Sequence, residues 1–553
     1  MSLTRRQVLQ LSAVGGLGVL NDACTGNNGT DAGTDAGLDA GMDATPDVPP
    51  MVDAGPTDGG VINVPIVIIG SGFGGAVSAL RLAQAGHDTV VLERGRRWPI
   101  VPGAWNTFAR LLTPDRKAMW MSESTALPFG PTFAISKYAG VLERIVGNGI
   151  NLYHGAGVGG GSLVYGGMLF TPRASAFDHV FPSTITFASM DPYYARARTT
   201  LRATPCPPDV LANPAWGSEA VFRAQAMAAG VPTAPVDIGV DWEIVRQEIA
   251  GTVPRSAMNG EVIYGNNNGC KLSLDQTYLK QAEDSGHCTV MPLHQVRDIT
   301  QGTSGKYVVM VDQINDVGDV IATKSFVCDY LFLSAGCNGT NNLLVKAKAK
   351  GLLPNLDEHV GQKFGNNGNA MFMRWGVGAN TGPLQASFGG QAIVDFENPI
   401  SAAMVEHAQF PSGLECNCLL QLGMCLDTGI GYFSYDAASD SAKVTWPEGA
   451  AMIPTMAMQN LADRLNTANG GTLTGSSVGI AVNGILTGFT YHPLGGMTIG
   501  EATDLYGRVN NYRKLYVIDG SLLPRSAGGV NPALTITALA ERCIERIIAD
   551  DFV

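Results

Sequence analysis

A strand–turn–helix–strand pattern between residues 66 and 95 constrains the fold of this chain more than any other stretch. The apolar run Ile66–Ile69 is short and β-branched, as in a buried parallel strand. A glycine-rich turn and a helical pattern follow, Gly86 ends the helix, and Thr89–Leu92 is a second apolar run. This order predicts the first βαβ unit of a dinucleotide-binding α/β domain.

The turn has the spacing G-x-G-x-x-G, and each glycine has its own physical role. Gly70 permits the tight turn, Gly72 lets the backbone approach a pyrophosphate, and Gly75 lets the helix pack closely on the strand. The helix N-terminus around Phe73 offers free N–H groups to the phosphates. Glu93 closes the second strand, where its carboxylate can accept hydrogen bonds from a ribose. We expect these five residues to bind a dinucleotide cofactor.

A second glycine-dense stretch, Gly155–Gly167, reads GAGVGGGSLVYGG. So many glycines are expected where a backbone lies flat against a ligand. The apolar side chains of Leu163 and Leu169 favour a buried path over a disordered loop. We assign these residues to cofactor binding: Gly157, Gly160, Gly161, Ser162, Gly166, Gly167 and Met168.

The middle of the chain contains candidate strands for two sheets. Tyr330–Gly336 is a buried run that ends in small residues, and we expect it to return to the dinucleotide-binding sheet. Strand-like runs between residues 370 and 460 predict an antiparallel sheet and a second part of α+β character. The other expected strands are Thr289–Val296, Tyr307–Val311, Lys324–Cys328, Leu419–Cys425 and Tyr432–Tyr435.

Two features near the C-terminus are candidates for chemistry. His492 lies in the turn YHPLGG and can act as a base toward a substrate. Asn531 and Pro532 suit the N-cap and first position of a helix, which we expect to run to about Ile548. Each feature alone is more often structural. Together they suit a redox cofactor, which needs a base near its substrate and a positive helix end near its electron-accepting edge.

The N-terminal region predicts export. An arginine pair precedes the apolar run Val8–Leu20, which is too short to span a bilayer, so residues 1–24 have the pattern of a twin-arginine signal. Residues 25–60 are dominated by Asp, Ala and Gly and predict a disordered linker. Cys24 lies where a lipid-bearing cysteine would stand, but the residues before it fit a lipoprotein cleavage site poorly, so lipidation stays open. We expect a secreted, periplasmic or cell-surface-tethered protein.

Composition and short motifs argue against several function classes. The net charge of −12 argues against nucleic acid as a partner. Ten cysteines, one of them Cys24, do not imply a complete disulfide framework, and we expect mostly buried thiols. The sequence contains no C-x-x-C or H-E-x-x-H motif, so we predict no metal site. Gly475–Gly479 matches G-x-S-x-G, but more glycines follow where a nucleophile elbow needs a helix.

From about residue 62 to residue 553 the chain resembles the glucose–methanol–choline (GMC) oxidoreductases and, within them, the bacterial cholesterol oxidases with non-covalent FAD. The matching blocks are VIIGSGFGGAVSALRLAQAGHDTVVLERG, GVGGGSLVYGGM, GNNNGCKLSLDQTYL, PLHQV, YLFLSAGCNGTNNLLVKA, TYHPLGG and LYVIDGSLLPRSAGGVNPALTITALAER. The resemblance implies an FAD site that also includes Val296, Asp519, Gly520, Asn531, Pro532 and Ala533.

The resemblance also implies the fold. We expect an α/β FAD-binding Rossmann-like domain of the GMC type and an α+β substrate domain built on an antiparallel sheet, both discontinuous in sequence. The FAD-binding domain would comprise residues 61–105, 150–180, 265–370 and 480–553. The substrate-binding domain would comprise residues 106–149, 181–264 and 371–479.

The implied activity is oxidation of a 3β-hydroxysteroid such as cholesterol to the 3-ketone, with oxygen as acceptor, hydrogen peroxide as product and Δ5 to Δ4 isomerisation. His492 resembles the active-site histidine that positions and activates the alcohol, and Asn531 resembles the asparagine beside the flavin. Glu406, in MVEHAQFPSG, resembles the carboxylate that moves the C4 proton to C6. The expected partners are an apolar alcohol, oxygen and a membrane surface for substrate extraction, and the protein is expected to be a monomer.

Two departures from the family pattern leave the substrate open. Tyr165 stands where the family usually has Asn, and the segment before Asn531 is one residue longer than usual. The segments expected to line a sterol cavity, around 105–150 and 370–480, match least. One alternative is a flavin oxidase or dehydrogenase for another alcohol, such as a sugar or a long-chain alcohol. Another is a tethered lipid-binding protein whose flavin chemistry has decayed.

Overall fold

The computed structural model describes residues 57–128, 132–473, 481–482 and 484–552. The predicted export signal, Cys24, the linker as far as residue 56 and the stretch Gly475–Gly479 lie outside these residues, so the statements about them stay predictions. None of the helices in the described ranges is long and apolar enough to cross a membrane.

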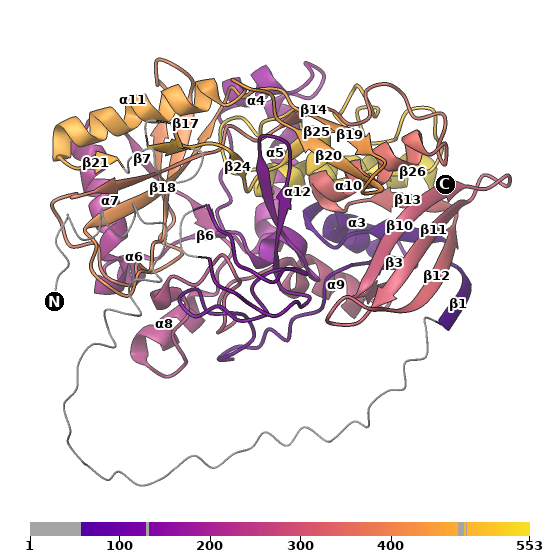
Figure 1. Cartoon of the computed structure of the whole chain (residues 1–553), viewed down its shortest axis with the longest axis horizontal. Coiled ribbons are helices and arrows are strands. Elements are labelled where there is room, and N and C mark those ends of the chain that lie inside the picture. The colour runs from indigo at the N-terminus through magenta and orange to yellow at the C-terminus, as the bar shows by residue number, and fades with distance from the viewer. Residues whose placement is uncertain (1–56, 129–131, 474–480, 483, 553) are drawn as a thin grey trace, which may run out of the picture.

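A five-stranded parallel sheet is the centre of the dinucleotide-binding part (Figure 1). Its strands in spatial order are β26 (Leu515–Val517), β13 (Tyr330–Leu333), β2 (Ile66–Ile69), β3 (Thr89–Leu92) and β9 (Cys288–Met291). Helix α3 (Phe73–Gln84) connects β2 to β3, and Ile66 pairs with Thr89. The predicted βαβ unit and the predicted returning strand β13 are confirmed.

The stretch Thr289–Val296 forms parts of two strands rather than one. β9 is the edge of the parallel sheet and ends at Met291, whereas β10 (His294–Gln301) begins a separate sheet. Between them Leu293 has a φ of 57°, and this left-handed residue turns the chain out of the first sheet. The prediction of a single strand was wrong because the pattern of apolar residues does not indicate the left-handed backbone torsion at Leu293. The second sheet has the order β1 (Thr57–Asn63), β12 (Val320–Cys328), β11 (Tyr307–Ile314), β10.

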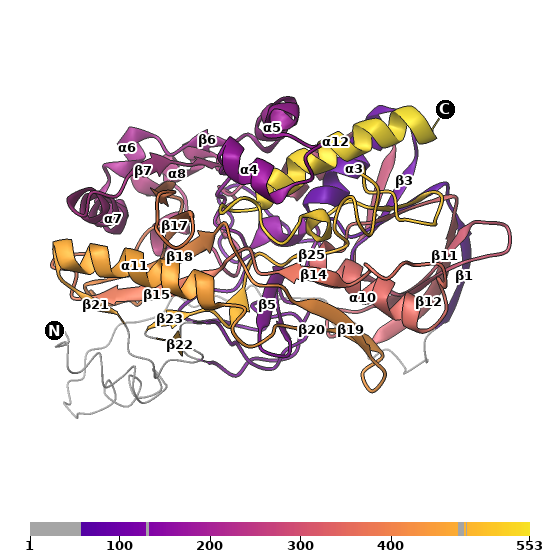
Figure 2. The same cartoon turned by 90° about the horizontal axis from the view of Figure 1, so that it is seen from above.

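An eight-stranded antiparallel sheet forms the other half of the molecule and confirms the α+β expectation (Figure 1). Its order is β22 (Ala481–Val482), β23 (Ile485–Leu486), β15 (Ala370–Trp375), β18 (Cys418–Cys425), β17 (Ala403–Ala408), β16 (Gln391–Asp395) and β7 (Thr233–Pro235), and β21 (Thr472–Leu473) also pairs with β15. Figure 2 shows helix α11 (Met452–Asn469) lying along this sheet.

The run Tyr432–Tyr435 does not belong to that sheet. It lies in β19 (Tyr432–Asp436), which pairs only with β20 (Ser441–Thr445) in a two-stranded ribbon. The ribbon packs on helix α10 (Gly336–Ala349), and Phe433 and Val444 join the core of the dinucleotide-binding part. The expectation that this strand joins the antiparallel sheet was therefore wrong, because tertiary packing chose its partner.

The remaining elements pack around these sheets. A three-stranded sheet has the order β24 (Phe489–Thr490), β5 (Asn151–Gly155), β4 (Leu142–Val146), and two-stranded pairs join β14 (Gln362–Gly365) to β25 (Leu494–Gly496) and β6 (Thr204–Pro205) to β8 (Asp237–Ile238). The other helices are α4 (Ala174–Val180), α5 (Phe187–Leu201), α6 (Pro208–Leu211), α7 (Gly217–Ala228), α8 (Trp242–Ala250), α9 (Tyr278–Asp284) and α12 (Ala533–Asp551). Short 3₁₀ helices are η1 (Gly160–Leu163), η2 (Pro214–Trp216), η3 (Ala257–Asn259), η4 (Leu274–Gln276) and η5 (Gly520–Leu522).

Strand alternation divides the antiparallel sheet into two faces. Val405 and Leu419 pack with helices α7 and α11 on one face. Met404, Leu420 and Leu422 belong to a different apolar cluster on the opposite face. Because successive side chains of a strand point to opposite faces, β17 presents Glu406 on the face of Met404. That face borders the cavity described next.

Candidate active site

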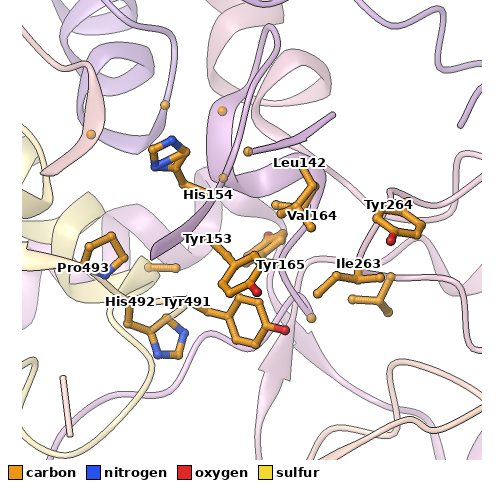
Figure 3. A pocket seen from close by; sticks show the side chains of 18 of the residues that line it. Leu142, Tyr153, His154, Val164, Tyr165, Ile263, Tyr264, Tyr491, His492 and Pro493 are labelled. Atoms are coloured by element: carbon orange, nitrogen blue, oxygen red, sulfur yellow. The ribbon is translucent and has the colours of Figure 1, made fainter. Parts of the chain in front are cut away.

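A cavity of about 1080 Å³ lies where the parallel sheet, the antiparallel sheet and the glycine-rich segments meet. Its lining includes Gly72 at one end and Glu406, His492 and Asn531 elsewhere. Figure 3 shows the region around His492, with several tyrosine side chains gathered there. The rings of Tyr153 and Tyr491 have centroids 5.3 Å apart. Residues distant in the sequence therefore share one large space.

The turn before helix α3 shows why glycine is needed. A Cβ added at Gly75 would collide with the carbonyl oxygen of Gly70, so close helix–strand packing requires this glycine. Gly70 itself has a φ of 96°, which L side chains rarely adopt. Gly72, by contrast, has open space where its Cβ would be, and it lines the cavity. This geometry explains the need for glycine at positions 70 and 75, and the pyrophosphate role of Gly72 stays a prediction.

Glu93 is buried at the end of β3 and lines the cavity. Its Oε2 accepts hydrogen bonds from the Ser71 backbone N–H (3.1 Å) and hydroxyl (2.7 Å). Its Oε1 accepts from the Gly95 N–H at 2.8 Å. Burial raises the pKa of this carboxyl, although the three donors oppose the rise. The turn thus fixes the carboxylate beside the cavity, where it can accept a ribose hydroxyl.

Most of the predicted cofactor residues line the cavity and four do not. Those that line it are Gly70, Gly72, Phe73, Glu93, Gly160, Gly161, Gly166, Met168, Val296, Asp519, Gly520, Asn531, Pro532 and Ala533. Gly75, Gly157, Ser162 and Gly167 lie behind the wall. The Ser162 hydroxyl donates to the Gly159 carbonyl and accepts from the Leu274 N–H, so it braces the glycine loop from outside. A Cβ at Gly167 would meet the side chain of Ile238.

The neighbours of His492 fix its tautomer. Asn369 Oδ1 accepts hydrogen bonds from the Tyr491 N–H (3.1 Å) and the Thr490 hydroxyl (2.9 Å). This orients the Asn369 amide so that its Nδ2 donates to His492 Nδ1 at 2.9 Å. Burial lowers the pKa of His492 to about 3, so the ring is neutral at ordinary pH. A neutral ring that accepts at Nδ1 carries its proton on Nε2 and offers it as a donor.

Glu406 is a buried carboxyl in the cavity wall whose pKa is shifted toward neutrality. Burial raises its pKa to about 7. A hydrogen bond from Asn531 Nδ2 to its Oε2, 3.2 Å long, opposes that rise, and the charge of Glu219 adds to it. A carboxyl with such a pKa can both accept and return a proton near pH 7.

Asn531 does not cap the last helix. α12 begins at Ala533, Pro532 is the residue at its N-cap, and no side chain caps it. The Asn531 amide instead donates to Glu406, and its buried Oδ1 has no hydrogen-bond partner among the described residues. The predicted N-cap was therefore wrong by one residue. The Asn531 side chain, which could have capped the helix, forms its hydrogen bond with Glu406 instead.

Tyr165 also lines the cavity. Its ring meets Phe73 edge-on with centroids 5.6 Å apart. Its hydroxyl is buried without a hydrogen-bond partner in the described chain, and burial raises its pKa above the usual value. The backbone before and at this residue is held by Lys271, whose Nζ donates to the Leu163 and Tyr165 carbonyls at 2.5 and 3.2 Å. Tyr165 is thus a fixed, neutral wall residue.

Sequence reasoning missed two polar clusters at the cavity. His407 Nδ1 lies 3.0 Å from Glu219 Oε2, and both side chains are fully buried behind Glu406. They come from β17 and α7, and Glu219 looks in the sequence like an ordinary acid in a first helical turn. The second cluster joins Arg94, Glu143 and His154. Glu143 and His154 are opposite each other on β4 and β5, a pairing that no local pattern announces.

The cavity fits FAD. The first turns of α3 and α12 both border it, and neither has an acidic residue or a side-chain cap, so both offer free N–H groups and positive partial charge. Gly72 with the start of α3 would hold the pyrophosphate, and Glu93 would hold the ribose. The orphaned Asn531 Oδ1 and the start of α12 would lie at the flavin end, near His492 and Glu406.

Comparison with known families agrees with this geometry. Residues 367–476 match the family model described as "GMC oxidoreductase, C-terminal", and residues 481–540 match "GMC oxidoreductase". Residues 68–103 match an NAD(P)-binding Rossmann-like domain. The C-terminal part of the chain is therefore similar to the GMC oxidoreductases. Glu406, His492 and Asn531 all lie within the two GMC segments.

Two cholesterol oxidases are among the proteins to which this chain is similar. The one from Mycobacterium tuberculosis (strain CDC 1551 / Oshkosh) is 27% identical, over 86% of this chain and 90% of the relative. The one from Acinetobacter baumannii is 26% identical, over 87% and 94%. Among solved structures, a fungal aryl-alcohol oxidase superposes with a TM-score of 0.62 at 14% identity, covering 89% of this chain and 99% of the other. A pyridoxine 4-oxidase gives a TM-score of 0.58 at 14% identity, covering 88% and 99%. These structures share the fold.

Proposed function

We propose that this protein is an FAD-dependent alcohol oxidase whose substrate is a 3β-hydroxysteroid such as cholesterol. The observation that carries the proposal is that Glu406, His492 and Asn531 all line one cavity. The glycine-rich turn before helix α3 lines the same cavity. The resemblance to two cholesterol oxidases over most of the chain supports the steroid class. It also supports non-covalent binding of FAD.

The fixed tautomer of His492 assigns the roles of the two acid–base groups. Its Nε2–H donates to the substrate oxygen and orients the alcohol. The hydroxyl proton is taken by the Glu406 carboxylate, because His492 already carries its only proton on the nitrogen that faces the substrate. When bound, FAD supplies hydride acceptance from the carbinol carbon and passes the electrons to oxygen, which gives hydrogen peroxide.

The same carboxyl group suits the isomerisation. After oxidation, the Δ5-3-ketone has an acidic C4 proton, which a carboxylate can remove and return at C6. Glu406 has a pKa of about 7, so both of its forms are accessible near neutral pH. Asn531 Nδ2 holds the carboxylate in place through the hydrogen bond to Oε2. Glu406 must first give up the hydroxyl proton that it took during oxidation, which can leave in the hydrogen peroxide, and its carboxylate then carries the C4 proton to C6.

The lining of the cavity favours an apolar substrate over a sugar. Leu111, Leu127, Val262, Ile263 and Leu420 all contribute to it, as do the aromatic side chains of Phe133, Tyr153, Tyr264, Phe388, Phe410 and Tyr491. An apolar wall gives a sugar's hydroxyl groups few partners and suits a fused-ring lipid. The aromatic share of the lining supports one second candidate, an alcohol oxidase for a smaller flat-ring alcohol.

Three further proposals rest on the sequence. We propose that the protein is exported by a twin-arginine signal, that it acts as a monomer, and that it meets its sterol at a membrane surface. Fractionation of cells and the effect of replacing Arg5 and Arg6 by lysine would test the first. Retention of the enzyme in the cytoplasm of the wild type would contradict it.

A peroxide assay with purified protein tests the proposed function. Cholesterol should yield hydrogen peroxide and a 4-en-3-one. Benzyl alcohol, which is a flat-ring alcohol, and glucose should each yield much less hydrogen peroxide. Glu406→Gln should lose both steps, and His492→Ala should lower kcat/KM by about 10²–10⁴-fold. Peroxide from benzyl alcohol but not from cholesterol would replace the proposal by the second candidate.

A further inference from the structure

Two cysteines stand at a position that the proposed reaction does not use. Cys416 and Cys418 lie where the segment after β17 enters β18. The residues just before them, from Gln409 to Leu414, line the cavity. Cys416 is partly exposed and Cys418 is buried. A pair of thiols therefore lies next to a segment that forms part of the wall of the substrate cavity.

The backbone between the two cysteines brings their side chains together. Cys418 is the first residue of β18, Cys416 lies just before that strand, and both cysteines pack against the cavity-side cluster of the antiparallel sheet. Asn417 between them has a φ of 51°, a left-handed conformation that Asn tolerates better than most residues and that kinks the strand. The two thiols are close enough for a hydrogen bond.

The surrounding segment is held by a small set of hydrogen bonds. Glu415 accepts from the Gly382 and Asn417 N–H groups at 2.5 and 2.7 Å, which anchors the kink. The Ser412 hydroxyl and Cys416 Sγ are 3.2 Å apart, so Cys416 also holds the cavity-lining turn. A change at Cys416 therefore acts directly on a cavity residue.

The electrostatics favour reaction at Cys416. The neighbouring Cys418 thiol, with help from Ser412, lowers the pKa of Cys416 to about 6, and the pKa of Cys418 rises correspondingly. Cys416 is thus largely thiolate near pH 7, and its partner is the protonated thiol of the pair. A thiolate with partial exposure beside a second thiol is the arrangement of a reactive cysteine with its resolving partner.

We propose that Cys416 and Cys418 are a peroxide-reactive dithiol that closes to a disulfide at the edge of the substrate cavity. The Cys416 thiolate attacks one oxygen of hydrogen peroxide, the O–O bond breaks, and Cys416 becomes a sulfenic acid while hydroxide leaves and takes a proton from the solvent to form water. Cys418 sulfur then attacks Cys416 sulfur, the S–O bond breaks, and a second water leaves. Two thiols are oxidised by two electrons and one peroxide is reduced to two waters.

The disulfide would change the cavity wall. Disulfide formation converts the Cys416 thiol, which is a hydrogen-bond partner of the Ser412 hydroxyl, into a disulfide sulfur, so it alters one restraint on the turn from Ser412 to Leu414. The biological sense of this step rests on the proposed function, because an oxidase supplies the peroxide at the same cavity. One residue separates Cys416 from Cys418, so their disulfide closes a small ring, and small strained disulfides are readily reduced.

Peptide mass spectrometry of the full-length flavoprotein tests the proposal without any substrate. The protein is treated with hydrogen peroxide at pH 7, unfolded, alkylated and digested. The peptide with Cys416 and Cys418 should then lack two hydrogen atoms, take no alkyl group, and regain two alkylation sites after reduction with dithiothreitol. Peptides with the buried Cys206 and Cys543 should stay fully alkylated in the same sample.

Other outcomes would overturn the proposal. Two alkylated thiols after peroxide treatment would show that the pair is inert, and a sulfinic acid on Cys416 or a disulfide between two molecules would show that Cys418 does not resolve it. Cys418→Ser supplies a second measurement, in which dimedone should trap a sulfenic acid on Cys416. Absence of dimedone labelling in a folded, FAD-containing Cys418→Ser protein would contradict attack by Cys416. Failure of the cholesterol assay would leave these results unaffected.

Discussion

At the scale of single residues, the division of labour between Glu406 and His492 follows from burial and hydrogen bonding. His492 has a pKa of about 3 and a neutral ring with its proton directed away from Asn369. Glu406 has a pKa of about 7 because it is buried. One group therefore donates a hydrogen bond throughout the usual pH range, and the other changes its protonation state near pH 7.

The pH dependence of kcat/KM should report Glu406. The base must be ionised, so below its pKa of about 7 the rate should fall about tenfold per pH unit, and above it the rate should level off. His492, with a pKa of about 3, should add no limb above pH 5. Glu406→Gln should remove the limb together with most of the activity. A wild-type profile that is flat from pH 5 to 8 would contradict this assignment.

Glu219 gives a second test of the same carboxyl group. Its charge raises the pKa of Glu406, while its own oxygens are held by the Gln391 N–H (3.0 Å) and His407. Glu219→Gln keeps the size of the side chain and removes the charge. The acid limb of the wild-type profile should therefore move to lower pH, with little change in the plateau rate. An unmoved limb in a stable Glu219→Gln protein would show that the two carboxylates do not interact.

At the scale of elements, the sequence determines most where a pattern is local. The unit β2–α3–β3 was predictable, because each of its glycines has a steric reason within a short stretch. Glu406 faces the cavity because β17 alternates. The Glu219–His407 pair was not predictable, since it joins α7 to β17 and depends on tertiary packing. The turn at Leu293 depends on one backbone torsion, and the helix start at Ala533 depends on the hydrogen bond from Asn531 to Glu406. Residue preferences determine neither of them.

Two glycines of the first turn provide a matched comparison. Gly72→Ala places a methyl group in the open cavity where the pyrophosphate is expected, so FAD affinity should fall while the Tm of the apoprotein stays near the wild-type value. Gly75→Ala collides with the Gly70 carbonyl and should destabilise the fold by about 1–3 kcal/mol. Titration with FAD and thermal unfolding of both apoproteins measure the two effects. Equal loss of stability in both variants would contradict a binding role for Gly72.

At the scale of the whole molecule, one cavity joins two sheets with different tasks. The parallel sheet brings the glycine turn, Glu93 and the start of α3 to one end. The antiparallel sheet and the C-terminal segment bring Glu406, His492 and Asn531 to the other end. The similarity to the GMC oxidoreductases agrees with this arrangement, and the apolar lining of the cavity directs the proposal toward a sterol.

The reaction of bound FAD with cholesterol in the absence of oxygen tests the central claim most directly. Wild-type protein mixed anaerobically with cholesterol should lose the visible absorbance of its flavin and regain it in air, with one hydrogen peroxide formed per sterol oxidised. The contradicting result is a flavin absorbance that does not change with cholesterol although the protein contains FAD and another alcohol bleaches it. That result would exclude a 3β-hydroxysteroid as the substrate.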